Sequence, residues 1–557
     1  MRISGDFAPL AEAIRGFLVT RQSFDSFPCG SMTRWDCDGY FIARSVCRGL
    51  AGRRAPAASP MSLKGVIVRI VLATPPADGE SDGSVGGLPP LGLLYLYSST
   101  ARLPHVEVHI VDATGENLNT PEAVERVLEL EPDVFGLSVL STNICRGLKL
   151  LKGVKRRSCS VTTVLGGVHA TLFDKQLLEE TPELDLVVRG EAELSFVDLC
   201  TRLMGGKDIG GVQGLSYRRG AEVIRGEPQI IEDLDALPFP DWSALDLSLY
   251  FQRFSAIPLW GNHKSAAVLT SRGCPHRCSF CSRITADLGK WRARSAENVF
   301  QELVQLSEKG FTDAFLVDEN TTASVSRLEK LCGMLIERTL NMRFACDGSL
   351  HHLSESTLKL MRRAGFDVIT VGVESGSDEQ LKRFNKPANS RALAAGIKRA
   401  KKAHFWVHSF FIAGGPGETP TDHEASKQFL SEVGPHSADF QWLTVFPGSQ
   451  LWNEYVGGDA TRPLSELSPR PIYELSEDPD ENTIRYRVNE LIRVFLRSWF
   501  RWNRMGEFVG LMRNNPLVRR WVVGALKNLP HFLRTAHGIK TSAQKLQFDP
   551  GKYMVLK

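Results

Sequence analysis

Three cysteines, Cys274, Cys278 and Cys281, form a CxxxCxxC triplet in the segment Ser271-Arg-Gly-Cys-Pro-His-Arg-Cys-Ser-Phe-Cys-Ser282. Thiolates at this spacing can bind three irons of a cubane iron–sulfur cluster and leave the fourth iron without a protein ligand. A zinc site would need a second CxxC or CxxH pair to complete a tetrahedron, and none follows nearby. Core cysteines do not fit either, because Gly273 and Pro275 place the triplet in a polar, turn-like stretch. We therefore expect these three cysteines to be the ligands of a [4Fe-4S] cluster.

The triplet resembles the signature of the radical S-adenosylmethionine (SAM) enzymes, in which an aromatic residue, here Phe280, precedes the third cysteine. The resemblance implies that the amino and carboxylate groups of SAM chelate the open iron. It also implies that reductive cleavage of SAM gives a 5′-deoxyadenosyl radical. The electron for this step would come from an external donor of the flavodoxin or ferredoxin type.

The composition is that of an ordinary globular protein. At 557 residues the chain is long enough for two or three domains, with 43% apolar and 23% charged residues. Eleven cysteines without paired spacing argue against a disulfide framework, so a reducing cytoplasm is the expected setting. No apolar run is long enough to predict a transmembrane helix.

The first 61 residues differ from the rest of the chain. They lack sustained hydrophobic periodicity, and no apolar segment with a cleavage site predicts a signal peptide. Met61 comes directly before the first strong strand pattern. We therefore expect residues 1–61 to be an extension that is either disordered or lies upstream of the true start.

Residues 62–230 alternate short apolar runs with segments of helical length. The five predicted strands are Val66–Thr74, Val106–Val111, Asp133–Val139, Ser160–Leu165 and Leu184–Val188. This alternation predicts an α/β domain with a doubly wound parallel sheet, Rossmann-like and of the flavodoxin type. Such sheets bind their ligands beyond the carboxyl ends of the strands.

The residues at those strand ends resemble a cobalamin-binding domain. Ser138-Val-Leu140 is similar to the family's SxL element and Gly166-Gly167 to its GG element, while Pro89–Leu96 and Arg189–Glu193 resemble the versions fused to radical enzymes. The resemblance implies that Ser138, Leu140, Gly166 and Gly167 contact cobalamin. Small residues allow close approach of the backbone to the cofactor tail, and a serine hydroxyl can hydrogen-bond it. A flavodoxin-like domain without a cofactor is the alternative.

One motif departs from the cobalamin pattern. Cobalamin mutases and methionine synthase use DxHxxG, whose histidine binds cobalt, but this chain has Asp112-Ala-Thr-Gly-Glu-Asn117, with Thr114 in place of the histidine. We therefore expect a cobalt without a lower histidine ligand. His169, just after the two glycines, is interpreted as an ordinary loop histidine.

Residues 231–260 are predicted to be a linker, whose proline-rich part Glu232–Trp242 packs one domain against the next.

In residues 261–455 six strands alternate with helices, and Ser295 and Ser354 are placed to cap two of those helices. The strands are expected at Ala266–Ser271, Ala314–Asp318, Arg343–Asp347, Asp367–Val373, Trp406–Ala413 and Asp439–Phe446. The cysteine triplet follows the first strand, as in the partial (βα)6, TIM-type barrel of the radical SAM family, whose chemistry lies at the carboxyl ends of strands.

Further motifs follow the later strands of this barrel. By resemblance, Glu319 binds the amino group of SAM, Gly372, Glu374 and Ser375 contact its ribose and carboxylate, and Gly414 lies at its adenine. Val445-Phe-Pro-Gly448 resembles another turn of the subfamily. Glu418 fits the start of a helix, and Cys332 and Cys346 are predicted to be core residues.

Residues 456–557 are predicted to be a basic helical region. From 481 to the end the chain has 15 Lys and Arg against 4 Asp and Glu. Apolar residues recur at helical spacing (Ile484, Val488, Leu491, Phe495, Trp499 and Trp502), with Arg485, Arg493, Arg497, Arg501 and Arg504 on other faces. This pattern favours a helix docked on the barrel, and the alternative is peripheral contact with an anionic membrane. No nucleic-acid partner is expected, because no RNA-binding module accompanies the charge.

Together these features resemble the cobalamin-dependent radical SAM enzymes over about residues 62–455. The resemblance implies transfer of a methyl group from methylcobalamin to an unactivated carbon or phosphorus of a small-molecule or lipid-like substrate. Oxidative cyclisation or another radical rearrangement in the same architecture is the first alternative. A tRNA methylthiotransferase would need further cluster cysteines and a β-rich RNA-binding tail, which Cys145, Cys159, Cys200 and the helical C-terminal pattern do not provide. A non-catalytic cobalamin sensor would not need the cysteine triplet.

Overall fold

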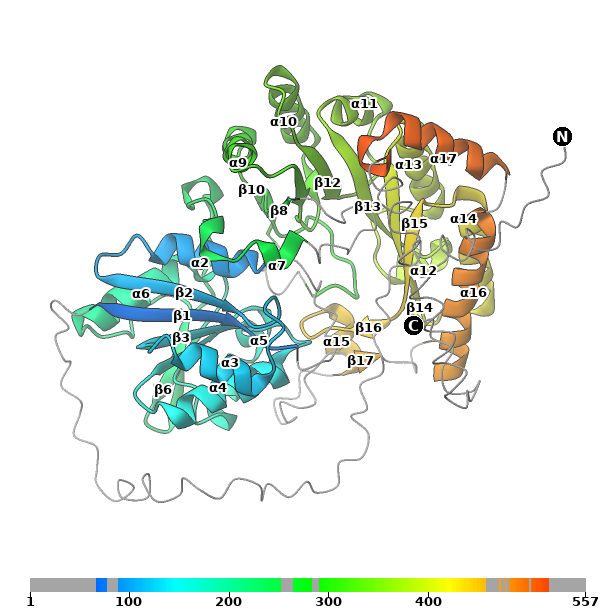
Figure 1. Cartoon of the computed structure of the whole chain (residues 1–557). Coiled ribbons are helices and arrows are strands. Elements are labelled where there is room, and N and C mark those ends of the chain that lie inside the picture. Colours follow the sequence, from blue (N-terminus) through cyan, green and yellow to red (C-terminus); the bar gives the residue numbers. More distant parts are fainter. Residues whose placement is uncertain are drawn as a thin grey trace, which may run out of the picture.

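The computed structural model describes residues 67–77, 89–251, 264–282, 290–456, 470–471, 476, 480–499 and 502–519. The extension expected at residues 1–61 therefore lies outside the described residues, as do residues 520–557 of the C-terminal region. The described chain forms two α/β units, the first drawn in blue and cyan and the second in green and yellow (Figure 1).

The first unit is built on a seven-stranded sheet in the order β2-β1-β3-β4-β5-β6-β7. Its parallel strands are β1 (Val68–Thr74), β2 (Val106–Asp112), β3 (Val134–Ser138), β4 (Thr162–Gly166) and β5 (Leu186–Val188). This order of parallel strands confirms the predicted flavodoxin-type winding. Two antiparallel strands, β6 (Leu215–Arg219) and β7 (Glu222–Arg225), extend the sheet and were not predicted.

Helices cover both faces of this sheet, which explains why its strands are apolar on both sides. One hydrophobic cluster joins the sheet to α3 (Thr120–Leu128), α4 (Ile144–Arg157) and α5 (Val168–Glu180). Another joins it to α2 (Leu91–Thr100) and α6 (Ala192–Gly205).

The second unit is an open six-stranded sheet in which every strand is parallel to its neighbours, in the order β15-β14-β13-β12-β11-β8. Neighbours in space are neighbours among these strands along the chain, which is the arrangement of a partial (βα)6 barrel. The strands are β8 (Ser265–Val268), β11 (Asp313–Leu316), β12 (Arg343–Asp347), β13 (Phe366–Glu374), β14 (Trp406–Ala413) and β15 (Ser437–Trp442).

The barrel helices are α9 (Ala296–Glu308), α10 (Val325–Glu337), α11 (Glu355–Arg363), α12 (Asp378–Arg383), α13 (Ser390–Lys402) and α14 (Pro420–Val433). Ser295 caps α9 by accepting from the Asn298 backbone N–H at 3.1 Å, and Ser354 caps α11 by accepting from that of Thr357 at 3.0 Å. Both predicted caps are confirmed.

Two of the predicted barrel strands are each divided into two strands in the structure. The run Ala266–Ser271 divides into β8 and β9 (Ser271–Arg272), and β9 pairs antiparallel with β10 (Arg292–Ala293). The run Asp439–Phe446 divides into β15 and β16 (Thr444–Val445), and β16 pairs with β17 (Arg470–Pro471). In both places the chain leaves the six-stranded sheet at its carboxyl edge. The residues that follow belong to loops above the sheet and not to the barrel strands.

The segment between the two sheets packs tightly against both units. It forms the turns η2 (Leu234–Ala236) and η3 (Trp242–Ala244) and the short helix α7 (Ser248–Phe251). Trp242 is 2% exposed in the barrel core and its ring lies 5.3 Å from that of Phe311. The Asp241 backbone N–H donates to the Ser98 hydroxyl of α2 at 2.7 Å.

The C-terminal helices lie on the outside of the barrel (Figure 1). In α16 (Glu481–Trp499) the predicted apolar residues Ile484, Leu491 and Phe495 are buried, and the helix contacts α14 and β15. α17 (Trp502–Asn514) follows it. The docked helix is thus confirmed. Among the described helices, none combines the length and the apolar character needed to cross a lipid bilayer.

We expect Trp242→Ala to lower the free energy of unfolding by about 3–5 kcal/mol, because it leaves a cavity where the linker enters the barrel core. Urea unfolding followed by circular dichroism measures the change. Leu194→Ala, which truncates a side chain that is 53% exposed, is the control and should change stability by less than about 0.5 kcal/mol. Equal losses in the two variants would contradict the packing role of Trp242.

Candidate functional site

The cysteine triplet lies in the loop that follows β9, beside the carboxyl end of the barrel sheet. Backbone hydrogen bonds hold this loop on two sides: the Ser279 N–H donates to the Phe384 carbonyl at 2.9 Å, and the Leu451 N–H donates to the Ser279 carbonyl at 3.0 Å. The Asn385 side-chain amide donates to the Arg277 carbonyl at 2.7 Å. The loop is therefore positioned by the turn after α12 and by the start of α15 (Gln450–Tyr455).

The chain that enters the loop is held by the buried carboxylate of Asp318, at the end of β11. Asp318 accepts from the backbone N–H groups of Thr270 at 2.6 Å and Ser271 at 3.1 Å, and from the Ser271 hydroxyl at 2.8 Å. The Thr270 hydroxyl also donates to it. These bonds place the first cysteine at a fixed distance from the second strand of the barrel.

The three thiols are half-buried. Burial raises the pKa of Cys278 to about 11, and the neighbouring Glu374, Cys281 and Cys274 raise it further against the opposing charge of Lys386. An iron cluster must therefore displace the protons, as metals do when they bind thiols. Within the described residues, no three His, Cys, Asp or Glu side chains converge tightly enough to hold a single metal ion. Ligands of a cubane cluster would not need to converge in this way, because each thiolate would bind a different iron.

A buried ion pair lies beside the triplet. Lys386 donates to Glu374 at 2.9 Å, and both side chains are largely buried. Glu374 has a φ of 66°, and the pairing of β13 with β14 is irregular between Gly372 and Glu374, so the end of β13 bends and turns this carboxylate toward Lys386. A Cβ on Gly372 would lie 2.1 Å from the Glu374 carboxylate. Lys386 was not predicted, since it belongs to none of the quoted motifs.

Ser375, the next predicted residue, is 1% exposed. Its hydroxyl lies 3.1 Å from that of Ser426 in α14 and accepts from the Ser377 N–H at 3.1 Å. In this structure the side chain of Ser375 thus contacts α14, whereas Glu374 lies near the cysteines.

Glu319 is half-buried in the loop after β11, next to several polar side chains at the mouth of the barrel. The neighbouring Asn320 amide lies 3.3 Å from His276 of the cysteine loop and 3.4 Å from the Ser349 hydroxyl. Burial lowers the pKa of His351 to about 4, with smaller contributions from nearby cations. Burial, with a smaller contribution from the charge of Asp318, raises the pKa of Asp347 to about 8. The side chains of Asn320, His276 and Ser349 therefore place hydrogen-bonding groups next to the predicted SAM residue.

Gly414 has a φ of 78°, and a Cβ there would lie 3.2 Å from Ile484 of α16. Its N–H donates to the Glu418 carboxylate at 2.5 Å, and Glu418 also pairs with the buried Arg487 at 3.3 Å. Glu418 lies where a helix begins, as predicted: it directly precedes Thr419, which caps α14. Its carboxylate also joins the turn after β14 to the C-terminal helix α16, which was not predicted.

The cobalamin-type residues lie together at the carboxyl edge of the first sheet. Ser138 and Gly166 are paired partners at the ends of β3 and β4. Gly167 has a φ of 96°, and a Cβ there would lie 2.4 Å from the Val139 carbonyl oxygen. Leu140 is 45% exposed, which is unusual for a leucine beside a buried sheet. The edge thus combines closely packed backbone at Gly167 with an uncovered apolar side chain at Leu140.

Thr114, which stands in place of the cobalt-binding histidine, and His169, the histidine after the two glycines, are both engaged within the protein. The Thr114 hydroxyl donates to the Pro75 carbonyl at 2.8 Å. His169 is not a loop histidine as predicted: it lies in α5, is fully buried, and its Nδ1 is 3.1 Å from the Ser141 hydroxyl. Burial lowers the pKa of His169 to about 3. The side chain is therefore a neutral core residue.

Phe280 connects the cysteine loop with the first sheet. Its ring lies 5.2 Å from that of Phe384 in an edge-on contact. Both belong to a hydrophobic cluster that includes Val139 and Ile144 of the first unit and Trp452 of α15. Figure 1 places α15 and the β16–β17 pair between the two sheets. The two candidate cofactor sites are thus joined by a continuous apolar contact.

Cys332 and Cys346 are fully buried in the barrel core, as predicted.

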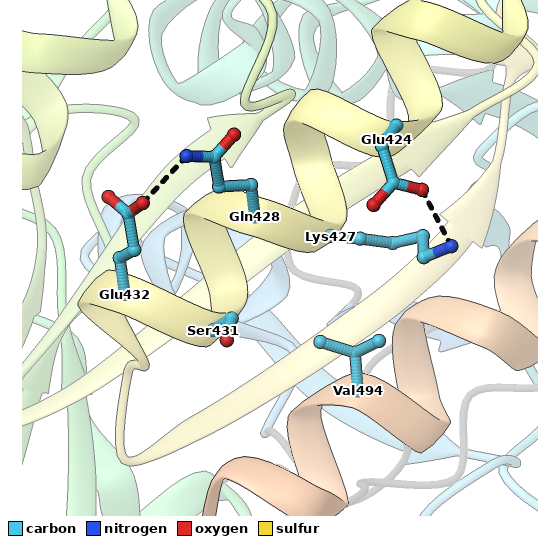
Figure 2. Close-up of a pocket in the computed structure, with 6 residues that line it drawn as sticks. All are labelled: Glu424, Lys427, Gln428, Ser431, Glu432 and Val494. Atoms are coloured by element: carbon cyan, nitrogen blue, oxygen red, sulfur yellow. Dashed lines mark hydrogen bonds and ion pairs between the residues drawn. The ribbon is translucent and has the colours of Figure 1, made fainter.

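A surface groove between α14 and α16 contains none of the predicted site residues. Figure 2 shows that its charged side chains interact along α14, where Lys427 pairs with Glu424 and Gln428 donates to Glu432. The groove therefore belongs to the exposed outer surface of the barrel and is not a candidate for the reaction.

Comparison with known proteins supports both units. The B12 binding domain model matches residues 84–200, and the radical SAM superfamily model matches residues 268–430. An uncharacterized methyltransferase of Pyrococcus horikoshii is 30% identical over 70% of this chain and 83% of its own length. The anaerobic magnesium-protoporphyrin IX monomethyl ester cyclase of Rubrivivax gelatinosus is 29% identical over 66% of each chain.

A solved structure gives the same fold. The radical SAM methyltransferase TsrM from Kitasatospora setae, with cobalamin and a [4Fe-4S] cluster bound, superposes with a TM-score of 0.58 at 17% identity, over 69% of this chain and 74% of that one. With its cysteine loop at the mouth of a partial barrel and its glycine-rich strand edge in a second sheet, this chain belongs to the radical SAM enzymes that carry a B12-binding domain.

Proposed function

We propose that this chain is a cobalamin-dependent radical SAM methyltransferase that methylates an unactivated carbon or phosphorus of a small-molecule substrate. The observation that carries the proposal is the joining of two sites in one packed structure. The cysteine loop lies at the strand ends of a radical SAM barrel, and the SxL and GG residues lie at the strand ends of a B12-binding sheet. The similarity to a methyltransferase over most of both chains supports methyl transfer.

The residues present fit the three cofactors that the family implies. Cys274, Cys278 and Cys281 would hold the cluster. Glu319, Gly372, Glu374 and Gly414 would surround SAM, with Phe280 packed behind the loop. The Ser375 hydroxyl contacts α14, so only the backbone of Ser375 could contribute. Ser138, Leu140, Gly166 and Gly167 would receive cobalamin, for which the exposed Leu140 offers an apolar contact, while glycine at position 167 lets the β3 and β4 loops pack closely. When bound, the cluster and SAM supply the radical and cobalamin carries the methyl group.

The chain's own residues bind, orient and shield these groups. The Asp318 carboxylate fixes the entry to the cysteine loop, and Lys386 places a positive charge beside thiols that must lose their protons. Glu374 pairs with Lys386 at 2.9 Å and balances its charge. A reducing partner of the flavodoxin or ferredoxin type would deliver the electron.

A radical cyclase is the second candidate. The observation that favours it is the similarity to the Rubrivivax gelatinosus cyclase over two thirds of this chain. Both candidates need the same three cofactors, so they differ in whether a methyl group of SAM enters the product.

Replacing the three triplet cysteines by alanine should remove the cluster, because no other cysteine in the described part of the chain lies in this loop. The wild-type chain, reconstituted anaerobically, should hold about four irons, and the variant should hold almost none and form no 5′-deoxyadenosine. Iron analysis and chromatography of SAM cleavage products measure both effects. Cys332→Ala, which alters a buried barrel cysteine, should retain iron and cleavage. Continued cleavage by the triple variant would refute the radical SAM assignment of the loop.

Gly167→Ala should weaken cobalamin binding about tenfold or more, because a Cβ would lie 2.4 Å from a backbone oxygen and strain a residue with positive φ by about 1–3 kcal/mol. Equilibrium dialysis with hydroxocobalamin measures the change. Gly220→Ala is the matched control, since Gly220 has a φ of 63° but no atom within 4 Å of the added Cβ. Equal affinity for cobalamin in the Gly167 variant and the wild type would exclude this edge as the binding site.

A further inference from the structure

Four buried charged side chains connect the two units. Arg272 and Arg292 are paired partners on the antiparallel strands β9 and β10 of the barrel. Glu191 and Glu193 follow β5 of the first sheet. All four side chains are at most 12% exposed, and their charges balance, two against two.

The contacts among these side chains are directional. Both terminal nitrogens of Arg292 donate to the Glu191 carboxylate at 2.8 Å, which is a bidentate contact. Arg272 donates to Glu193 and also lies 3.4 Å from Glu191. Bidentate guanidinium–carboxylate pairs fix orientation as well as distance. Burial acts to raise the pKa of Glu191, but the two arginines outweigh it and hold the pKa below its usual range.

Neighbouring groups hold the four side chains in place. The Ile231 backbone N–H donates to Glu191 at 2.6 Å, and Arg292 donates to the Ile231 carbonyl. The Arg272 guanidinium lies 5.4 Å from the centre of the Tyr95 ring in α2. The linker and α2 thus contribute to the same contact.

Both ends of this contact lead directly to a cofactor site. On the barrel side, Arg272 is two residues before Cys274. The residues on both sides of Arg272 are held in place. Asp318 binds the Ser271 N–H, and Gly273 packs so closely against the Lys290 carbonyl that an added Cβ would lie 2.2 Å from it. On the other side, β5 is the parallel neighbour of β4, which ends at Gly166. No long flexible segment separates the four charges from either site.

We propose that Arg272, Arg292, Glu191 and Glu193 form an interdomain clamp that sets the distance and orientation between the cobalamin site and the cluster site. The inference rests on the proposed function, since it requires both cofactors. The four side chains are positioning residues and do not touch the reacting atoms. Methyl transfer is sensitive to such positioning, because a displacement of about 1 Å can lower a rate about 100-fold.

The test uses the full chain, reconstituted anaerobically with iron, sulfide and hydroxocobalamin, and the variants Glu193→Gln and Arg272→Gln. Pulsed EPR measures the distance distribution between cob(II)alamin and the reduced cluster. We expect one narrow distribution in the wild type and a shifted or broadened one in both variants. In the presence of a chemical reductant that gives cob(I)alamin and the reduced cluster, transfer of a labelled methyl group from SAM to the bound cobalamin, with release of S-adenosylhomocysteine, should fall at least tenfold, while iron content, cobalamin content and 5′-deoxyadenosine formation stay within about twofold.

Arg343→Gln is the control, because it breaks a buried ion pair with Asp367 that lies entirely within the barrel. It should leave the distance distribution unchanged, and a matching broadening would overturn the clamp as a specific device. Glu193→Gln keeps the shape of the side chain, so this variant decides the question if Arg272→Gln does not fold. If the variants bind both cofactors and show the wild-type distance distribution, the clamp proposal is overturned while the proposed function stands. A wild-type chain that retains no cobalamin would instead overturn the proposed function.

Discussion

The buried carboxylate of Asp318 is the interaction on which the cysteine loop depends. It lies at the end of β11 and accepts hydrogen bonds from two backbone N–H groups and two hydroxyls of Thr270 and Ser271. Hydrogen bonds to a charged group contribute about 1.5–3 kcal/mol each, and a buried carboxylate without them would be strongly unfavourable. The carboxylate therefore holds the chain that leads to Cys274 in one conformation.

Buried ion pairs repeat this arrangement at other loops around the site. Glu374 and Lys386 join the end of β13 to the turn after α12, and Glu418 and Arg487 join the turn after β14 to α16. Buried pairs are weak evidence for stability, because desolvation offsets much of the attraction. Their common feature here is location: each joins a loop at the carboxyl edge of the barrel to an element from elsewhere in the chain. This supports a role in fixing geometry.

Much of the fold was predictable because its strands are apolar on both faces and alternate with helices. The bounds of Arg343–Asp347 and Trp406–Ala413 agree with β12 and β14. The strands β6 and β7 were missed, since two short antiparallel strands with many charged residues carry little hydrophobic signal. The break between β8 and β9 was also missed. It depends on Asp318, which is 48 residues from Thr270 in the sequence.

The site was predictable where residues near one another in sequence perform the chemistry, as in the cysteine triplet and the two glycines. Lys386 and Arg487 could not be found in this way, because they belong to none of the quoted motifs and reach their partners Glu374 and Glu418 only in the folded chain. His169 shows the converse error: its place after two glycines indicated a loop, but α5 begins there and buries the ring. The glutamates of Arg189–Glu193 and the arginine before Cys274 were already present in quoted motifs, and opposite charges in two such motifs are a usable signal.

The most direct test of the account follows the methyl group of SAM. The reconstituted chain is incubated with reductant, an extract of the native cells and SAM carrying a deuterated methyl group, and the products are compared by mass spectrometry with those from unlabelled SAM. The account predicts 5′-deoxyadenosine together with a small-molecule product whose mass shifts with the label. Formation of 5′-deoxyadenosine with a product that never carries the label would contradict methyl transfer and favour the cyclase.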